Sequence, residues 1–408
     1  MNPNPESSSG RKPRLVFVAN SMYSRTVSGG EVHNFNLVAG ALAAGYKVHF
    51  VCGHALKVEL DRRQIPATIT LTDGGLLPTF DYSSLSEQFR LLGLYFRRLR
   101  ASLKTLQEIR PEDVVYSTTE FWWDYVPAVR CSAKRKILYL GMDAPSLEEI
   151  ILKSRPDVKA VRLPSLHYWM AQQFSLRGFR KLPNKRLIFA HENQSPRLLR
   201  MGYRPQDLVF VGNGVDLHQP RAVSEQEKIY DVVWVGRVHK QKGIEDLMTT
   251  LVHLAKRIPG FRAAMVGDLR QTLGPQVEAA GLGKVVEFSG YVSEAEKYRY
   301  LKSSRVFLMP SRYESWGIVV GEALASNLPV VAYDLECYRP VFGDLVRYVD
   351  CFDSEAYKRA AEDTVLKARA GQNVLDQHKL ERFIQDNSWQ KVGERFLEAV
   401  RSLEPSWD

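Results

Sequence analysis

Two glutamates, Glu314 and Glu322, stand eight residues apart across a predicted strand-to-helix junction. Residues 305–310 form a short apolar run that predicts a buried strand, and a helix is expected to begin at Trp316 or Gly317. Open parallel sheets bind ligands at the carboxyl ends of their strands, where Glu314 is expected to lie. Two carboxylates beside a helix amino end can accept hydrogen bonds from hydroxyl groups while the helix end faces an anion. This combination suits a sugar nucleotide, and the alternative is one buried and one solvated glutamate on an ordinary helix.

Two cations, Arg237 and Lys242, stand five residues apart in a similar position. They follow the apolar run 231–236 and precede a helix expected from Ile244, so we expect them in a loop at the carboxyl end of another strand. An arginine and a lysine beside a helix amino end form the kind of clamp that holds phosphate groups. The alternative is a pair of solvated loop cations.

Two adjacent glycines, Gly29 and Gly30, follow the first apolar run of the chain, residues 14–20. A helix is expected from Glu31 to about Ala44, and a second strand follows it, which gives a βαβ unit. Glycines at this place allow backbone N–H groups to approach an anion closely, and the helix dipole favours that anion. The alternative is a flexible turn without a ligand.

In this order, the motifs resemble those of the retaining GT-B glycosyltransferases of family four, also called glycosyl transferases group 1. The resemblance runs from about residue 14 to residue 398 and rests on Gly29–Gly30, the Asn-Gly-Val-Asp sequence at 213–216, the Arg237–Lys242 pair and the Glu314–Glu322 pair. It implies an α/β protein with two Rossmann-like doubly wound domains that face a central cleft, and a C-terminal helix that crosses back to the first domain. The expected segments are a disordered tail (1–13), an acceptor-binding domain (14–217), a nucleotide-sugar-binding domain (218–386) and the C-terminal helix (387–408).

The resemblance implies transfer of a sugar from a nucleotide-sugar donor, a UDP- or GDP-sugar, with retention of the anomeric configuration. The residues that it implies at the reaction centre are Glu314, Arg237 and Lys242. Those that it implies around the donor are Gly29, Gly30, Gly236, Ser315, Trp316, Gly317, Ile318 and Glu322. The two cations would stabilise the departing diphosphate, so no metal or other cofactor is expected. The sequence also has no Asp-x-Asp motif, the usual metal ligand of the other major glycosyltransferase fold.

Candidate acceptor residues follow predicted strands of the first domain. They are Thr118, Glu120, Asp124 and Asp143. Many relatives carry a histidine beside the reacting sugar where Thr118 stands, so this chain departs from the family there. We expect a glycan or a lipid-linked acceptor, and the sequence does not identify which.

The positive charge of the chain, +10 in formal net charge, is concentrated in two segments. Residues 90–104 hold five Lys or Arg and no acid, and residues 153–186 hold nine against one acid. Such a localised excess favours an anionic surface or ligand over a nonspecific coat for nucleic acid, so no nucleic-acid partner is expected. Each segment is compatible with two interpretations, a solvated basic surface or an interface with an anionic membrane.

Residues 89–106, within the first basic segment, predict an amphipathic helix. Its apolar stripe consists of Leu92, Phe96, Leu99, Leu103 and Leu106. The opposite face carries Arg90, Arg97, Arg100 and Lys104. The helix is expected either to pack on the sheet with its basic face in water, or to meet lipid headgroups with that face.

The rest of the composition points to a cytoplasmic protein, with the inner face of the membrane as an alternative place. The first fourteen residues hold no apolar core, so no signal peptide is expected, and no apolar run reaches the ~18 residues of a spanning helix. The four cysteines have neither metal-ligand spacing nor the density of a secreted scaffold.

Two rival functions remain compatible with these motifs. The first keeps the fold and changes the reaction, as in a nucleotide-sugar epimerase or a phosphorylase. The second is a basic membrane-binding protein with a relict nucleotide fold. The second rival predicts that the basic segments matter and that Glu314, Arg237 and Lys242 do not.

Overall fold

The protein is described here by a computed structural model. It describes residues 13–22, 27–73, 85–152, 162–372 and 374–403. The chain divides into two compact units, and each is described by itself. Unit 1 groups Met1–Ala144, Leu166–Val211 and Val392–Asp408, and unit 2 groups Pro145–Ser165 and Gly212–Lys391.

Unit 1 contains a parallel seven-stranded sheet with the order β3-β2-β1-β4-β5-β6-β7. Its strands are β1 (Arg14–Ala19), β2 (Lys47–Cys52), β3 (Thr68–Leu71), β4 (Val114–Ser117), β5 (Arg135–Leu140), β6 (Lys185–Phe189) and β7 (Leu208–Phe210). Its helices are α1 (Gly29–Ala43), α2 (His54–Arg62), α3 (Leu85–Lys104), α4 (Trp122–Arg130), most of α6 (Arg162–Arg180), α7 (Gln194–Arg200) and most of α16 (Trp389–Arg401), with short 3-10 turns at Leu106–Glu108 and Pro205–Asp207.

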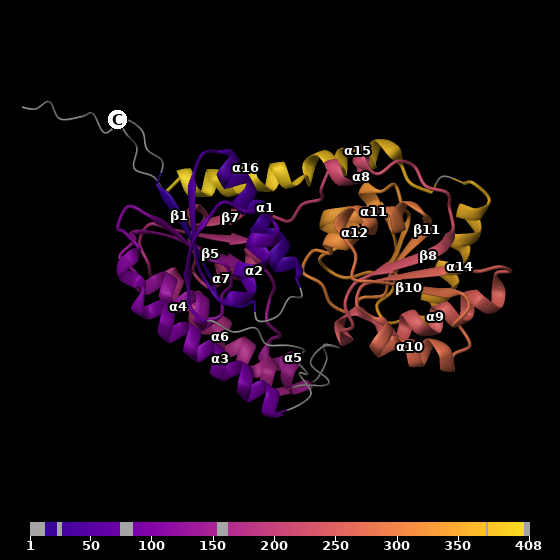
Figure 1. Cartoon of the computed structure of the whole chain (residues 1–408), viewed down its shortest axis with the longest axis horizontal. Coiled ribbons are helices and arrows are strands. Elements are labelled where there is room, and N and C mark those ends of the chain that lie inside the picture. Colours follow the sequence, from indigo (N-terminus) through magenta and orange to yellow (C-terminus); the bar gives the residue numbers. More distant parts are fainter. Residues whose placement is uncertain (1–12, 23–26, 74–84, 153–161, 373, 404–408) are drawn as a thin grey trace, which may run out of the picture. The chain divides into compact units, whose positions relative to one another are not determined.

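The central strand β1 shows why this sheet needs helices on both faces. Phe17 points to one face, where its ring lies 6.3 Å from Phe396 of α16. Val16 and Val18 point to the other face and share a core cluster with Ala128 of α4. Because successive side chains of a strand alternate between faces, an apolar run such as β1 is stable only when both faces are covered. Figure 1 shows α16 on one side of this sheet and α3, α4 and α6 on the other.

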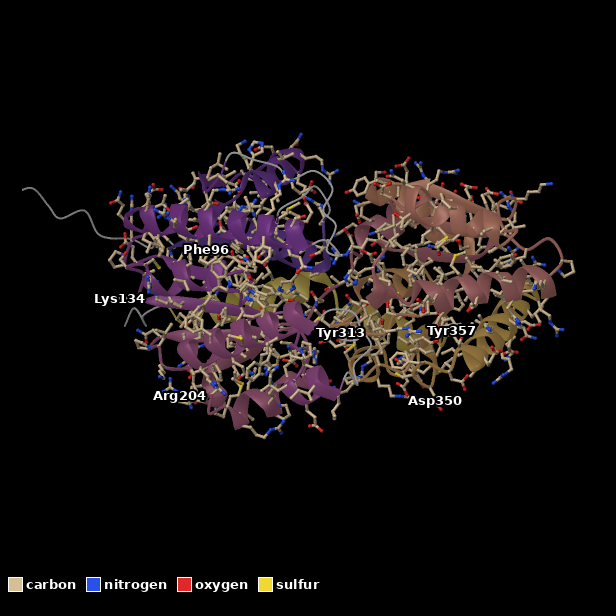
Figure 2. The ribbon with its side chains drawn as sticks, turned by 90° about the horizontal axis from the view of Figure 1, so that it is seen from below. Phe96, Lys134, Arg204, Tyr313, Asp350 and Tyr357 are labelled. Carbon is tan, nitrogen blue, oxygen red and sulfur yellow. The ribbon has the colours of Figure 1, made fainter. Side chains whose placement is uncertain are left out.

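The most deeply buried face of α3 differs from the apolar stripe that its sequence predicts, since Leu92, Leu99 and Leu103 of that stripe are only half-buried. The buried positions are Leu94, Tyr95, Arg98 and Ser102, whereas Phe96 of the predicted stripe is 57% exposed. Figure 2 looks onto this side of unit 1 and labels Phe96. A charged residue therefore takes a place in the core that the pattern assigned to leucine and phenylalanine.

Arg98 is stable inside unit 1 because partners meet its guanidinium there. It forms an ion pair with Asp73 and donates hydrogen bonds to the carbonyl oxygens of Asn20 and Met22. The guanidinium lies against Gly53, where an added Cβ would come within 2.5 Å of it. Arg98 thus does not contribute to the exposed charge of the segment 90–104.

The second basic segment is also less uniform than its composition suggests. Lys185 is buried and forms an ion pair with Asp207, and Arg186 donates hydrogen bonds to Ser402 of unit 1. Residues 153–161 of this segment lie outside the described residues.

Unit 2 contains a parallel six-stranded sheet with the order β10-β9-β8-β11-β12-β13. Its strands are β8 (Tyr230–Val235), β9 (Ala263–Val266), β10 (Val286–Gly290), β11 (Ser304–Met309), β12 (Val330–Tyr333) and β13 (Val346–Val349). Its helices are α5 (Leu147–Leu152), α8 (His218–Ala222), α9 (Ile244–Arg257), α10 (Arg270–Ala279), α11 (Glu294–Lys302), α12 (Ile318–Ala325), α13 (Arg339–Phe342), α14 (Ser354–Arg369) and α15 (Gln377–Asp386), with a 3-10 turn at Lys240–Lys242.

Both sheets are doubly wound, which confirms the expected α/β fold class. In unit 1 the chain runs outward from β1 to β3 and then returns to the other side of β1 at β4. In unit 2 it runs from β8 to β10 and returns at β11. A reversal of this kind leaves a crevice at the carboxyl ends of the two central strands, because the loops after them leave in opposite directions. Each unit therefore has one such switch point, at β1/β4 and at β8/β11.

Candidate active site

The switch point of unit 2 brings together the two loops that carry the predicted catalytic residues. The loop after β8 holds Arg237 and Lys242, and the loop after β11 holds Glu314. The loops are joined directly, since the backbone N–H of Arg312 donates to the carbonyl oxygen of Gln241 at 2.7 Å. The side-chain amide of Gln241 donates in return to the carbonyl oxygen of Tyr313 at 2.6 Å.

Two glycines allow this close approach. Gly243, which precedes α9, has a φ of 64°, and an added Cβ would lie 1.8 Å from the carbonyl oxygen of Pro310. Gly317, which precedes α12, has a φ of 86°, and an added Cβ would lie 2.8 Å from the ring of Tyr338. Both positions are left-handed and crowded, so both require glycine. The sequence predicted that Gly317 lies near the donor. The structure shows its backbone role, which is to adopt the left-handed conformation before α12.

Lys242 and Glu314 form an ion pair at the centre of this site. The distance from Nζ of Lys242 to Oε1 of Glu314 is 2.6 Å, and their side chains are 17% and 9% exposed. An ion pair that is largely removed from water attracts more strongly than one on the surface. The structure thus brings together Lys242 and Glu314, which are 72 positions apart in the chain and were both predicted at the reaction centre.

Arg237 lies beside this pair in sequence but has a different environment. Its side chain is exposed, and within the described ranges of the chain it forms no ion pair or hydrogen bond. A guanidinium without a partner at the end of β8 is available to an anionic ligand. The predicted pair of cations is therefore split into one cation bound to a carboxylate and one open to solvent.

Glu322 lies inside α12, and its partner is a residue that sequence reasoning missed. Nζ of Lys297, on α11, lies 2.7 Å from Oε1 of Glu322 and 2.7 Å from a carboxylate oxygen of Glu294. Burial raises the pKa of Glu322, although the ammonium group of Lys297 opposes this shift. Burial opposes the charge on Lys297 as well, but the two carboxylates prevail and raise its pKa. No signal in the sequence distinguishes Lys297 from a solvated lysine that pairs with Glu294 three residues earlier.

The remaining residues predicted around the donor have mixed positions. Trp316 is buried against Phe342, with ring centroids 5.2 Å apart, so its ring belongs to the core of unit 2. Gly236 lies over the ring of Trp234, where an added Cβ would come within 2.9 Å. Ser315 and Ile318 are half-buried. Over the described part of the chain, no cluster of three or more His, Cys, Asp or Glu is arranged to hold a metal ion.

In unit 1, Gly29 and Gly30 begin α1 two residues earlier than predicted. Ser28 caps the helix, and its hydroxyl accepts a hydrogen bond from the N–H of Gly30 at 3.3 Å. The carboxylate of Glu31 accepts one from the N–H of Ser28 at 2.8 Å. This capping box fixes the helix start and leaves both glycines exposed at its amino end.

Asp124 is a buried hydrogen-bond acceptor at the switch point of unit 1. It accepts from the N–H of Asn20 at 2.5 Å, from the hydroxyl of Ser21 at 2.7 Å and from the hydroxyl of Thr119 at 2.6 Å. Burial raises the pKa of Asp124 to about 6, although these hydrogen bonds oppose the shift. The side chain thus joins the loop after β1 to the loop after β4.

Glu120 is equally buried, and its environment resists ionisation. Its Oε1 accepts hydrogen bonds from the hydroxyl of Tyr168 and the side-chain amide of Gln172, both at 3.0 Å. Burial raises the pKa of Glu120 to about 7 despite these bonds. Asp143 forms an ion pair with Arg197.

Thr118 is buried as well, and its hydroxyl donates to the carbonyl oxygen of Val18 at 2.9 Å. Among the predicted acceptor residues Thr118, Glu120, Asp124 and Asp143, every one therefore has an internal partner in unit 1.

The match to a known protein family lies within the second unit. Residues 215–377 match the family described as Glycosyl transferases group 1. The chain is similar to an alpha-maltose-1-phosphate synthase of Mycolicibacterium smegmatis, with 29% identity over 49% of this chain and 52% of the relative. It is also similar to a phosphatidyl-myo-inositol mannosyltransferase of the same species, with 31% identity over 40% of this chain and 45% of the relative. The matches thus span about half the length of these curated relatives.

Solved structures resemble the fold over nearly the whole chain. The structure of HepE from Anabaena, in complex with UDP and glucose, has a TM-score of 0.68 and 15% identity, and the match covers 95% of this chain and 100% of that chain. At this identity the likeness concerns the fold alone. Together with the doubly wound sheets of the two units, it shows that the chain has the GT-B fold, and residues 215–377 match the glycosyl transferases of group 1.

Proposed function

We propose that this protein transfers a sugar from a nucleotide-sugar donor to an acceptor, with retention of the anomeric configuration. The observation that carries the proposal is the Lys242–Glu314 ion pair of 2.6 Å, at the switch point where open α/β sheets bind ligands. The exposed side chain of Arg237, in the same loop as Lys242, supplies a further positive charge.

The charges of the reaction explain why these residue types suit it. When the bond between the anomeric carbon and the diphosphate breaks, negative charge develops on the diphosphate and positive charge on the sugar ring. Arg237 and Lys242 stabilise the diphosphate, and the carboxylate of Glu314 orients sugar hydroxyls near the ring. In this proposal the leaving phosphate accepts the proton of the acceptor hydroxyl, so no other residue is needed as a base. The two cations serve in place of a metal ion.

The nucleoside is proposed to lie nearer to Glu322. A carboxylate held by Lys297 can accept hydrogen bonds from the two ribose hydroxyls while its charge is partly balanced. The donor is proposed to be a UDP- or GDP-sugar, and the HepE structure, which has the same fold, contains UDP.

We further propose a glycan or lipid-linked acceptor and an association with an anionic membrane. Unit 1 exposes Phe89 and Phe96 on α3, and Met170 and Phe174 on α6, close to the exposed cations of both helices. Apolar side chains beside cations are typical of proteins that lie on a membrane surface. A relative acts on a phosphatidyl-inositol, as its name states. None of the described helices combines the length and apolarity needed to cross a bilayer.

Donor binding can be tested before the acceptor is known. We expect UDP, GDP or one of their sugar conjugates, in the presence of EDTA, to raise the melting temperature of the wild type selectively, because a ligand stabilises the state that binds it. Replacement of both Arg237→Ala and Lys242→Ala should abolish the shift. The matched control is Lys256→Ala, an exposed lysine of α9 in the same unit. If no nucleotide raises the melting temperature of the wild type, the proposed function is wrong.

The membrane association has its own test. The wild type should sediment with anionic vesicles at low salt, and less at high salt, because salt screens the attraction to the headgroups. Phe96→Ser together with Phe174→Ser should weaken the sedimentation. Absence of sedimentation at low salt would contradict this part and leave sugar transfer untouched.

A further inference from the structure

A basic hollow lies in unit 1 at the carboxyl ends of α6 and α7. It has a volume of about 600 Å³, and its charged lining residues are Arg180, Lys181, Lys185, Arg204 and Asp207. A second hollow of about 380 Å³ shares Arg180 and Lys181 and adds Arg177 and Arg200. Because Lys185 begins β6, the hollow lies at the amino ends of the parallel strands. The switch point of unit 1 lies at their carboxyl ends, so the two sites are distinct.

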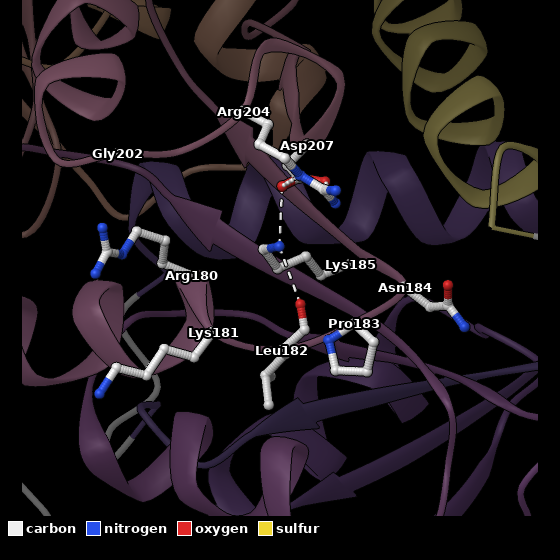
Figure 3. A pocket seen from close by; sticks show the side chains of 9 residues that line it. All are labelled: Arg180, Lys181, Leu182, Pro183, Asn184, Lys185, Gly202, Arg204 and Asp207. Carbon is white, nitrogen blue, oxygen red and sulfur yellow. Dashed lines mark hydrogen bonds and ion pairs between the residues drawn. The ribbon is translucent and has the colours of Figure 1, made fainter.

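One acid, Asp207, lines the hollows, and two of their cations already neutralise it. Arg204 donates two hydrogen bonds to Asp207, both at 2.9 Å, and Lys185 donates one at 2.9 Å. Burial opposes the charge of Asp207, but these bonds prevail and hold its pKa below the ordinary value. Figure 3 shows this group, with Lys185 between Asp207 and the carbonyl oxygen of Leu182.

The four other cations, Arg177, Arg180, Lys181 and Arg200, have no such partner. In the described ranges of the chain, none of them forms an ion pair or donates a side-chain hydrogen bond. In Figure 3, Arg180 and Lys181 point away from the Lys185–Asp207–Arg204 group. Arg180 lies against Gly202, where an added Cβ would come within 2.4 Å of its guanidinium. A φ of 84° also requires glycine there, so the main chain is shaped to admit the arginine.

The helix dipoles explain only part of this charge. Arg177 and Arg180 lie in the last turn of α6, and Arg200 lies in the last turn of α7. Each helix end carries about half a negative charge, which favours a cation nearby. Two helix ends therefore balance about one of the four unpartnered cations. The other cations are exposed, and their combined positive charge attracts an anion from outside.

The exposed face of α6 indicates what kind of molecule carries that anion. Met170, Phe174 and Arg177 follow one another at spacings of four and three residues, so they form one stripe along α6, and Lys181 follows directly after the end of the helix. The apolar half is open to solvent, with Met170 56% and Phe174 60% exposed. The stripe thus runs from an apolar surface directly into the basic hollow.

We propose that this hollow binds phosphate esters, with an anionic lipid headgroup as the ligand that suits the adjoining apolar stripe. Guanidinium groups hold phosphate oxygens through paired hydrogen bonds, and Lys181 adds a point charge. The apolar half of the stripe, Met170 and Phe174, contacts the acyl region. The inference does not depend on sugar transfer, and only its vesicle arm rests on the proposed membrane association.

The test compares two double variants that change the net charge equally. The first is Arg177→Glu with Lys181→Glu, at the hollow. The control is Lys47→Glu with Lys256→Glu, two exposed lysines that form no ion pair within the described part of the chain. One arm measures sedimentation with phosphatidylcholine vesicles that contain phosphatidic acid, against phosphatidylcholine alone. The other arm measures the binding of inorganic tripolyphosphate by calorimetry.

We expect the hollow variant to bind the phosphatidic acid vesicles about tenfold more weakly, and the control to bind as the wild type does. A loss confined to tripolyphosphate would uphold the phosphate site and assign it to a soluble phosphate. The proposal is overturned if the two double variants behave alike in both arms, whether unchanged or equally weakened. Arg177→Gln with Lys181→Gln should show a smaller loss of the same kind, and it guards against misfolding of the charge-reversed chain.

Discussion

The two switch points of this molecule have the same strand topology, but their charged side chains have different partners. At β8/β11 of unit 2, the loops carry the Lys242–Glu314 pair and an exposed Arg237. At β1/β4 of unit 1, the loop after β4 carries Glu120 and the first turn of α4 carries Asp124, and both carboxylates are buried and accept hydrogen bonds from their own unit. The first arrangement leaves charge available to a ligand. The second uses its carboxylates to hold loops in place.

This difference shows that residue type and position at a strand end do not define a ligand contact. Glu120 and Glu314 both follow parallel strands at switch points, and the sequence suggested a substrate-facing role for both. What separates them is the charge of the partner. Glu314 forms an ion pair with a lysine, whereas Glu120 accepts hydrogen bonds from a phenol and an amide in a buried setting. The three predictions below test this contrast, beginning with the largest effect.

Removal of the cation at the switch point of unit 2 should have the largest effect. We expect Lys242→Ala to lower the rate of sugar transfer by about 10² to 10³, because the positive charge beside the departing diphosphate is lost and Glu314 loses its partner. The measurement is kcat and KM with a saturating acceptor, and Lys242→Arg should recover part of the rate. Lys256→Ala is the control in the same unit. A normal rate for Lys242→Ala would show that the pair is structural, as in unit 1.

The buried carboxylate of unit 1 should instead affect stability, with a defined sign. The pKa of Glu120 is raised to about 7, so the folded state holds its proton more tightly than the unfolded state does. This contribution to stability is complete below the ordinary pKa and is lost as the pH rises towards 7. Between pH 5 and pH 8, Glu120 should lower the free energy of unfolding by about 2 to 3 kcal/mol.

Glu120→Gln should remove that pH dependence, because both hydrogen bonds of the wild type reach Oε1, which the amide retains. Urea unfolding of the variant at pH 5 and pH 8 measures the change. Glu192→Gln, an exposed residue of the same unit, should follow the wild type. An identical pH dependence for wild type and Glu120→Gln would show that Glu120 is ionised when folded, and the contrast between the units would weaken.

The sequence predicted most of the fold because its signals are local. Buried parallel strands appear as short apolar runs, and the glycines and helix starts at 29–30 and 317 lie beside them. The meeting of Lys242 and Glu314 follows from two loops placed at the carboxyl ends of adjacent strands. The order of motifs along the chain therefore predicted that Lys242 and Glu314 lie in one site, but it did not predict their ion pair.

What the sequence did not predict depends on partners distant in the chain. The buried face of α3 contains Arg98, which the predicted apolar stripe does not include, because Asp73 and two carbonyl groups satisfy it inside. Lys297 shows no pattern that assigns it to Glu322, since its neighbour Glu294 already explains a surface pair. In both cases a tertiary contact overrides the local pattern, and only the packed structure displays it.

The smallest expected effect on binding concerns Lys297, and it tests the contrast between the buried carboxylates of the two units. Its ammonium group lies between Glu294 and Glu322, so removal of each neighbour should move the pKa of Glu322 in a known direction. In Lys297→Met, a buried carboxylate loses its cation, so its pKa should rise and donor binding should weaken about tenfold near neutral pH. In Glu294→Gln, a negative charge that raises the pKa of Glu322 is removed, so that pKa should fall.

If donor binding requires ionised Glu322, the pH midpoint of binding should shift upward in Lys297→Met and downward in Glu294→Gln. Calorimetric titration with the nucleoside diphosphate between pH 5 and pH 9 measures both midpoints, and circular dichroism verifies that both variants remain folded. A merely structural role for Lys297 would weaken binding equally at every pH. Opposite shifts would instead show that unit 2 keeps its buried carboxylate charged through a neighbouring cation, whereas unit 1, at Glu120, has only neutral donors for the same purpose.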